Sequence, residues 1–227
     1  MPNNILGLSD VDNVLIEHVR DSLLKIIIRV QGSSTNSEIE KSLKYLVEHL
    51  DGLQIAHDIS QRQEQLPLEP VNIKEITEIA MQSLQTSNFY GDVKLINSVN
   101  HKEPVLAHRK SLIRSLDSML KAAIDFANYD GPVSMVLSTK RLGDCLRVGV
   151  YSDAIAINAS ELRYFNQNVG VSRRPSANMS ANTAAHLYVA STLSEAMGIK
   201  FRTAISSKSR GLAMVLPFST QLQLVSL

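Results

Sequence analysis

The first sixty residues carry apolar side chains at intervals of three and four positions. In one stretch these positions lie between Val11 and Val30, and in a second stretch between Ile39 and Leu53. Such spacing places apolar side chains on one face of an α-helix. The segment from Gly32 to Ser34 interrupts the pattern, so the sequence predicts two helices joined by a short turn.

The second predicted helix has a seam suited to packing against other helices. From Ile39 to Leu53 its apolar positions alternate steps of four and three, and the resulting period of about 3.5 residues is typical of coiled-coil packing. His57 continues this seam and is expected to be a partly buried interface residue. A lone antiparallel hairpin cannot cover both of its apolar faces. Residues 1–66 are therefore predicted to dimerise, with two hairpins forming a four-helix bundle.

After the proline-rich segment Leu66 to Pro70, the pattern changes to helices alternating with short strands. The predicted helices cover Ile73 to Leu84, His108 to Ala127 and Asn182 to Met197; the predicted strands cover Val93 to Val99, Pro104 to His108, Val133 to Ser138, Cys145 to Tyr151, Ile199 to Ala204 and Leu212 to Leu216. This order predicts an α+β protein, with a helical hairpin over residues 1–66 and an α/β sandwich over residues 67–227.

Composition narrows the class of protein. The chain has 23 Lys and Arg against 22 Asp and Glu, a net charge of +1, so no nucleic-acid footprint is predicted. Cys145 is the only cysteine, which excludes a disulfide framework and a thiolate metal site and favours a reducing compartment. The apolar runs are too short to span a bilayer, and no signal peptide is recognised at the start. The expectation is a cytoplasmic protein without direct membrane insertion.

The order of parts, with the segment from Leu66 to Ile76 (L-P-L-E-P-V-N-I-K-E-I), resembles the catalytic core of bacterial sensor histidine kinases. In that family a dimerising hairpin that carries the phosphorylated histidine precedes an ATP-binding domain of the gyrase, heat-shock, kinase and mismatch-repair type. The resemblance covers about residues 10 to 218 and implies the same architecture. The individual motifs of the family are matched less well.

The phosphoacceptor motif of the family, H-E-[LF]-R-[TN]-P-L, corresponds to Glu17 through Leu23 (E-H-V-R-D-S-L). Glu17 takes the acceptor position, and His18 stands one residue later, which is about 100° further around a helix. A carboxylate cannot form the phosphoramidate that an imidazole forms. Two interpretations of His18 stay open: a solvent-facing residue without chemistry, or a phosphate acceptor.

The asparagine box of the family, N-L-[LI]-x-N-A-x-[KR]-[FY]-[TS], corresponds to Ser118 through Ala127 (S-M-L-K-A-A-I-D-F-A). In the family its second asparagine coordinates the Mg²⁺ that bridges the phosphates. Ala122 takes that position here, and a methyl group offers no oxygen to a hard cation.

The first glycine box of the family, D-x-G-x-G-I, corresponds to Ser152 through Ile157 (S-D-A-I-A-I). Ser152 replaces the aspartate that binds the adenine amino group, and Ala154 and Ala156 replace both glycines. A Cβ at these positions obstructs backbone conformations and close approaches that glycine allows. Asp153 is interpreted as a turn residue.

The second glycine box, G-x-G-L-G-L, corresponds to Asn182 through Leu187 (N-T-A-A-H-L), where Ala184 and His186 replace glycines. In the family this segment opens a helix whose amides hold phosphate, so an imidazole there is a steric obstacle; His186 is expected to be a packed or rim residue. The polar loop before it contains Arg173 and Arg174. These arginines are placed like the ATP lid of the family and are expected to be solvated.

The substitutions remove the groups of a nucleotide site while the apolar pattern around them is kept. The sequence therefore predicts a pseudokinase: a dimeric, non-catalytic protein of two-component signalling, without ATP, another cofactor or a metal. Its expected partner is a response-regulator receiver domain or a kinase, docked near Arg20, Asp21 and Leu24 on the first helix. Two alternatives stay open, a histidine phosphotransferase that relays phosphate through His18, and a weakly active kinase with a remodelled pocket.

Overall fold

A computed structural model describes residues 66–87, 93–127, 132–156, 181–205 and 210–219, together with six single positions. These positions are Val19, Gly52, Ile55, Ala56, Ile59 and Ser160, all of them helical. The predicted hairpin and its interface residue His57 otherwise lie outside the described residues. No helix in the described part of the chain combines the length and the apolar character that crossing a membrane requires.

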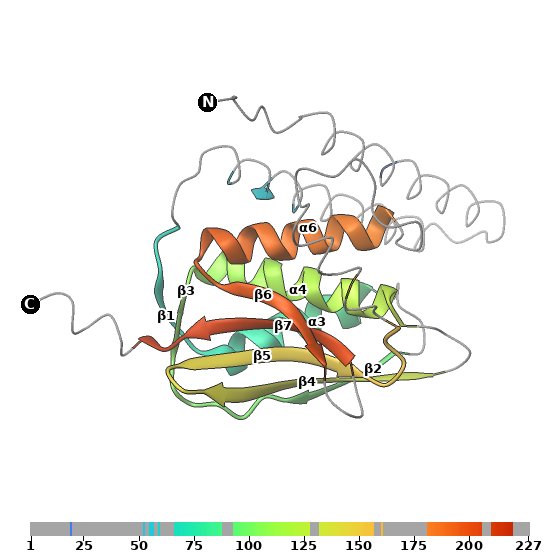
Figure 1. Ribbon diagram of the computed structural model, residues 1–227, viewed down its shortest axis with the longest axis horizontal. Helices are drawn as coiled ribbons and strands as arrows, with labels where there is room; N and C mark the ends of the chain where they lie inside the picture. The colour runs from blue at the N-terminus through green and yellow to red at the C-terminus, as the bar shows by residue number, and fades with distance from the viewer. Residues whose placement is uncertain are drawn as a thin grey trace, which may run out of the picture.

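The described chain from residue 66 onward alternates strands and helices in a mixed order (Figure 1). The elements are β1 (Glu69–Val71), α3 (Ile73–Ser87), β2 (Val93–Ser98), β3 (Val105–Ala107), α4 (Arg109–Asp125), β4 (Val133–Leu142), β5 (Cys145–Ser152), α6 (Ala181–Ala196), β6 (Lys200–Ile205) and β7 (Arg210–Pro217). Every helix and strand predicted for residues 67–227 is present, so the prediction of a mixed α/β domain is confirmed.

The largest difference at the end of a predicted element is in β4. This strand continues past Ser138 to Leu142, because it pairs with β5 up to a two-residue turn at Gly143, whose φ is 58°. The short strand β1 falls in the proline-rich segment, for which no strand was predicted, and it pairs antiparallel with β3 in a separate two-stranded sheet. Proline is tolerated in such an edge strand, where its missing N–H faces no partner.

The main sheet has five strands in the order β2-β4-β5-β7-β6. β2 runs parallel to β4, and the other neighbouring pairs are antiparallel. α3, α4 and α6 lie together on one face of this sheet (Figure 1). No described helix covers the opposite face, so the described part of the domain is a two-layer sandwich.

The hydrophobic core fills the space between the helices and the sheet. Its fully buried members include Leu112, Leu116, Met119 and Leu120 of α4, Met135 and Leu137 of β4, Leu146, Val148 and Val150 of β5, and Leu212, Met214 and Leu216 of β7. In β4 and β5 the buried core residues are spaced two apart, and the residues between them face the other side of the sheet. The alternation explains why the apolar pattern alone located the strands.

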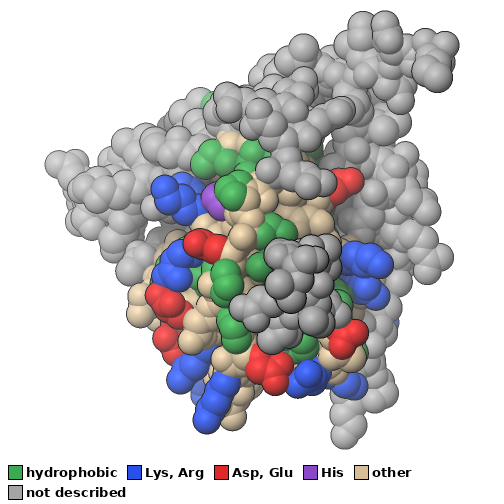
Figure 2. All heavy atoms as spheres, turned by 90° about the vertical axis from the view of Figure 1, so that its left-hand side faces the viewer, with side chains coloured by type: hydrophobic (Ala, Val, Ile, Leu, Met, Phe, Trp, Pro, Cys, Tyr) green, Lys and Arg blue, Asp and Glu red, His purple; other side chains and the backbone are tan. Residues whose placement is uncertain are grey.

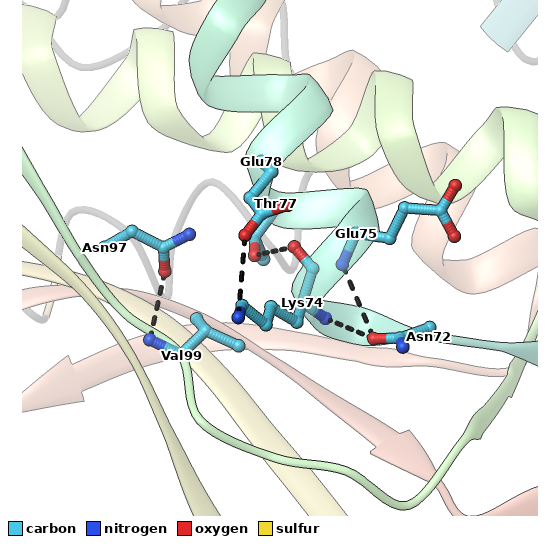
Figure 3. Close-up of polar contacts among 7 residues, drawn as sticks. All are labelled: Asn72, Lys74, Glu75, Thr77, Glu78, Asn97 and Val99. Atoms are coloured by element: carbon cyan, nitrogen blue, oxygen red, sulfur yellow. Dashed lines mark hydrogen bonds and ion pairs between the residues drawn. The ribbon is translucent and has the colours of Figure 1, made fainter.

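α3 begins at a side-chain cap supplied by Asn72 (Figure 3). The Asn72 Oδ1 atom accepts hydrogen bonds from the backbone N–H groups of Lys74 (3.0 Å) and Glu75 (3.4 Å), which satisfies donors that a helix start leaves open. Glu75 also forms an ion pair with Arg109 at the start of α4. The hydrogen bond from the Arg109 guanidinium holds the pKa of the Glu75 carboxyl below its usual value. The two helices are thus joined at their N-terminal ends.

α6 ends at Ala196 and is followed by a turn at Gly198. The Gly198 N–H donates to the Glu195 carbonyl (2.8 Å), and the Ile199 N–H donates to the Ser194 carbonyl (2.8 Å). Gly198 has a φ of 67°, and this left-handed conformation is the reason glycine is favoured there. The turn directs the chain straight into β6.

The C-terminal end of β7 is held by the Phe218 side chain. Its ring stacks on His101 with 5.1 Å between centroids, and the Arg141 guanidinium lies 4.9 Å from its centroid. Arg141 also donates to the Glu103 carboxylate at 3.0 Å. Figure 2 views this end of the molecule, where side chains of both charge signs are mixed. The charge of Arg141 is therefore compensated locally.

Two glycines on adjacent strands give a matched test of packing. A Cβ at Gly211 would lie 1.9 Å from the Val150 carbonyl oxygen, whereas a Cβ at Gly149 would meet the Tyr151 ring, starting at 2.6 Å from its hydroxyl. The Val150 backbone cannot move away from a Cβ added at Gly211. The Tyr151 ring, in contrast, can rotate toward solvent to make room for a Cβ at Gly149. We expect Gly211→Ala to lower the free energy of unfolding by about 2 kcal/mol or more, and Gly149→Ala by less than about 1 kcal/mol. Urea denaturation measures both, and equal losses would contradict the prediction.

Candidate functional site

The three segments that align with nucleotide-binding motifs meet at the C-terminal end of α4. The Ala156 N–H donates to the Phe126 carbonyl (3.1 Å), and Ala127 forms a β-bridge with Ile155. From α6, the Thr183 hydroxyl donates to the Asp125 carboxylate at 3.4 Å. The fold therefore brings the residues aligned with the asparagine box and both glycine boxes into one region.

Ala122 belongs to a seam of small side chains between α4 and α6. Ser111, Ser115, Ser118 and Ala122 follow one another at helical spacing on α4, and all are buried. The Ser115 hydroxyl lies 2.8 Å from the Ala190 carbonyl and 3.0 Å from the Ser194 hydroxyl. The two helices therefore approach closely, and Ala122, with none of its surface exposed, is part of the core.

Asp125 adds a feature whose importance the sequence comparison missed. It stands at the position where the asparagine-box pattern has lysine or arginine, so the charge is inverted. Its carboxylate accepts the hydrogen bond from Thr183 and would repel a phosphate group placed between α4 and α6. The aligned motif contains this signal, since its pattern has a basic residue where this chain has Asp125.

Ser152, at the position of the adenine-binding aspartate, has its hydroxyl engaged within the protein. Its Oγ donates to the Ser134 carbonyl (2.8 Å) and accepts from the Ala154 N–H (3.2 Å), and the residue is buried. Asp153 is exposed at the bend that follows β5, in agreement with its interpretation as a turn residue. The Ser152 hydroxyl is thus already engaged within the protein.

The alanines of the first glycine box flank a buried isoleucine. Ile155 is 2% exposed and belongs to the main core, Ala154 is half-buried against that core, and Ala156 is exposed. The bridge from Ile155 to Ala127 fixes this segment against the end of α4. An apolar side chain thus occupies the junction of the two motifs.

The second glycine box lies on the first turns of α6 and is packed inside the protein. Ala184 is 3% exposed and His186 is 1% exposed. His186 is therefore a packed residue, one of the two environments expected for it, and not a rim residue. The loop with Arg173 and Arg174 lies outside the described residues.

α4 also carries a buried ion pair that the sequence comparison did not predict. The Lys121 ammonium lies 2.8 Å from Asp117 Oδ2, one helical turn away, and both side chains are almost fully buried. In the described part of the chain the second oxygen, Asp117 Oδ1, is buried without a hydrogen-bond partner. Because Lys121 is at the variable position of the asparagine box, the family pattern gave no reason to expect a charge there.

The outer face of α6 contacts the region of the predicted hairpin. Ala56 packs with Ala185, Val189 and Leu193 in a small apolar cluster, and Ile59 packs against it. The three α6 residues are spaced four apart and so share one face of the helix. The second predicted hairpin helix is therefore in contact with the domain at these positions.

The residues predicted to act on the first helix cannot be placed in the same way. Glu17, His18, Arg20, Asp21 and Leu24 lie outside the described residues. Their neighbour Val19 is helical and half-buried, as the apolar periodicity of that segment predicts.

The observed residues do not fit Mg²⁺–ATP. Ala122 offers no oxygen ligand, Asp125 places negative charge near the expected phosphates, and Ile155 fills the junction of the motifs. Across the described ranges, no group of three or more His, Cys, Asp and Glu side chains is arranged to hold a metal ion. The region has the position of a nucleotide site and the packing of a protein core.

Comparison with known proteins identifies the class of fold. No protein-family model matches the sequence, and a sequence search of curated proteins finds no match. Solved structures of histidine kinases do share the fold, so the chain has a histidine kinase-like core. At identities of 10 to 16% this similarity concerns the fold alone.

Three of these structures illustrate the extent of the similarity. The histidine kinase AdeS of Acinetobacter baumannii gives a TM-score of 0.61 at 10% identity, covering 89% of this chain and 98% of its own. Full-length ShkA, in complex with AMPPNP, gives 0.57 at 16% identity, covering 79% of this chain and 37% of its own. The mycobacterial sensor histidine kinase MprB gives 0.51 at 14% identity, covering 66% of this chain and 97% of its own.

The buried ion pair of α4 can be tested against an exposed pair of the same spacing. We expect Lys121→Met to lower the free energy of unfolding by about 3 to 5 kcal/mol, because it leaves the Asp117 carboxylate buried without its partner. Adding Asp117→Leu should recover much of that loss. Lys74→Met removes one partner of the exposed Lys74–Glu78 pair (4.0 Å) and should change stability little. Urea denaturation of the four variants, including Asp117→Leu alone, measures the coupling; additive losses would contradict it.

Proposed function

We propose that the protein is a non-catalytic signalling protein of the two-component type, a pseudokinase that keeps the histidine kinase fold and does not bind ATP. The observation that carries the proposal is the packing of the nucleotide-site region. Ala122, Ile155 and His186 are each at most 2% exposed, and all three stand in aligned motif segments. Side chains that complete a core leave no volume for an adenine and three phosphates.

Electrostatics in the same region supports the proposal. A nucleotide site needs positive charge or free N–H donors facing the phosphates. Where the C-terminal end of α4 meets the first turn of α6, the Asp125 carboxylate accepts a hydrogen bond from the Thr183 hydroxyl. The Ser152 hydroxyl, at the adenine-binding position, already has its partners within the protein. Binding ATP would require breaking these contacts as well as repacking the core.

We propose different roles for the two parts of the chain. Residues 1–66 form the helical hairpin that dimerises and docks a partner, and residues 67–227 form the ATPase-like domain that supports it. The contact of Ala56 with α6 supports a role for the domain as a fixed platform for the hairpin. The proposed partner is a response-regulator receiver domain or a kinase, which docks around Arg20, Asp21 and Leu24.

Nucleotide binding is tested by calorimetric titration with ATP and Mg²⁺. We expect no heat of binding from this protein, because core side chains occupy the site. ShkA, whose structure contains AMPPNP, serves as the positive control when AMPPNP is titrated into both proteins under identical conditions. A saturable heat with one site per chain would overturn the proposal and favour a divergent kinase.

Docking and phosphotransfer are tested with a receiver domain in the phosphorylated and unphosphorylated forms. We expect the receiver to bind the purified protein, and binding to weaken by about tenfold or more for Arg20→Ala with Leu24→Ala, as for central contacts of an interface. The phosphorylated receiver should transfer no label.

Label that appears on the protein and disappears in the His18→Ala variant would identify a phosphotransferase. Lys110→Ala, on the exposed surface of α4, is the control substitution for binding. If it weakens receiver binding as much as the Arg20→Ala and Leu24→Ala pair does, the docking surface is misplaced.

A further inference from the structure

The charged residues in the strands of the main sheet are all basic. The whole chain is almost neutral, with 23 basic and 22 acidic residues, yet β2, β4, β5, β6 and β7 contain basic side chains and no acidic ones. The basic residues are Lys94, Lys140, Arg141, Arg147, Lys200, Arg202 and Arg210. Such a segregation within one sheet is not explained by the composition of the chain.

Strand register places five of these residues on the face that no described helix covers. Residues that pair across strands share a face, and every second residue returns to it. Lys140 pairs with Arg147, and Arg147 and Lys200 both pair with Val215. The adjacent pairs place Arg202 opposite Ala213 and Lys94 opposite Ser134 on the same face. We call Lys94, Lys140, Arg147, Lys200 and Arg202 the basic face.

The charges of the basic face are not compensated nearby. Lys94, Lys140, Lys200 and Arg202 are exposed and Arg147 is half-buried, and none of the five has an ion-pair partner among the described residues. The other two basic residues of the strands have polar partners: Arg141 pairs with Glu103, and Arg210 has a polar contact. Like charges placed directly opposite each other, as Lys140 and Arg147 are, destabilise a sheet. An anionic partner would remove that penalty.

The centre of the basic face carries an aromatic ring beside a guanidinium. Tyr151 lies across Gly149, where a Cβ would meet its hydroxyl and ring. Burial raises the pKa of Tyr151, and Arg147, four residues earlier on the same face, acts in the opposite direction. Arg147 Nε is buried without a hydrogen-bond partner within the described ranges. The neighbouring guanidinium and phenol are both donors suited to phosphate oxygens.

Exposed aliphatic side chains border the basic face. Ile96 of β2 is 37% exposed and pairs with Val136, and Leu142 at the end of β4 is 39% exposed. Both belong to the outward-facing positions of their strands. Among the described residues, the acidic side chains next to these strands stand in turns, Asp144 before β5 and Asp153 after it. The described surface therefore combines cations, a phenol and two aliphatic side chains over its strands, with acids at its ends.

We propose that the basic face docks on the anionic surface of a phospholipid membrane. The cations extend over two dimensions, from the edge strand β2 to the opposite edge strand β6, across strands about 4.8 Å apart. A lipid surface presents phosphates in two dimensions and can contact all of them through long side chains, whereas a nucleic-acid strand follows a line and needs several stacking aromatic residues. Ile96 and Leu142 suit the interface between headgroups and acyl chains.

The test is sedimentation of the full chain with large unilamellar vesicles. One set contains phosphatidylcholine alone, and the other contains phosphatidylcholine with phosphatidylglycerol as a third of the lipid. We expect binding only to the anionic vesicles, and weaker binding as salt rises from about 0.1 M to about 1 M, which shortens the Debye length from about 10 Å to about 3 Å. The absence of binding to anionic vesicles at the lower salt concentration would overturn the proposal.

Two variants that lose the same net charge distinguish binding through the basic face from a general electrostatic attraction of the protein to the vesicles. Lys200→Gln with Arg202→Gln, on the sheet, should weaken partitioning about thirtyfold. Lys74→Gln with Lys110→Gln, at exposed positions of α3 and α4, should leave it within about twofold. Urea denaturation checks that both variants fold. Equal losses in the two variants would overturn the assignment to the sheet.

A single-stranded oligoribonucleotide serves as the competing ligand. If it binds and the sheet variant loses that binding, while the vesicles do not bind, the face recognises nucleic acid and the membrane proposal fails. Vesicle binding requires neither nucleotide nor a phosphorylated partner. Its outcome is therefore independent of the tests of the signalling proposal.

Discussion

The close contact between α4 and α6 is the constraint on which the arrangement of the domain depends. Small side chains along α4 let the two helices approach until the Ser115 hydroxyl reaches the Ala190 carbonyl, 2.8 Å away. The same two helices carry two of the three aligned motif segments, and the third is fastened to the end of α4 through Ala156 and Ile155. The position of every motif residue therefore follows from this one helix pair and its fit to the sheet.

In the region where the aligned motif segments meet, the side chains contact the rest of the protein. At the aligned positions these are a methyl group in the helix seam, a serine hydroxyl hydrogen-bonded to the backbone of Ser134 and Ala154, and a carboxylate that accepts a hydrogen bond from a threonine. Alanine in the interior of a helix adds favourable helix propensity, and buried apolar surface adds stability. The packing of these residues therefore contributes to the stability of the fold.

The helices and strands of the domain could be predicted because each one depends on the residue pattern within its own segment. Period-two and period-3.6 apolar patterns reflect which faces are buried, and the turns at Gly143 and Gly198 require positive φ values that glycine adopts easily. β1 was missed because its pairing with β3 is non-local and its proline indicated a break. The burial of Lys121 beside Asp117 was missed for a related reason. From sequence alone, a charged residue on a helix is expected to be exposed. Its burial can be recognised only when the surrounding packing is known.

The candidate site could be predicted in part. Aligned motifs identified Ala122, Ser152, Ala154, Ala184 and His186, and the structure adds their burial. The packed state of His186, and the contact between Asp125 and Thr183, depend on how two helices meet. No pattern along a single helix contains that information.

The buried seam also limits which side chains position 122 can accept. An asparagine there would place an amide between two helices that touch through hydroxyl and methyl groups, in a site with no exposed surface. Burying a polar group without a partner costs free energy. The charge of Asp125 would also stay in place. A single substitution toward the asparagine of the histidine kinase motif would therefore lower the stability of the domain.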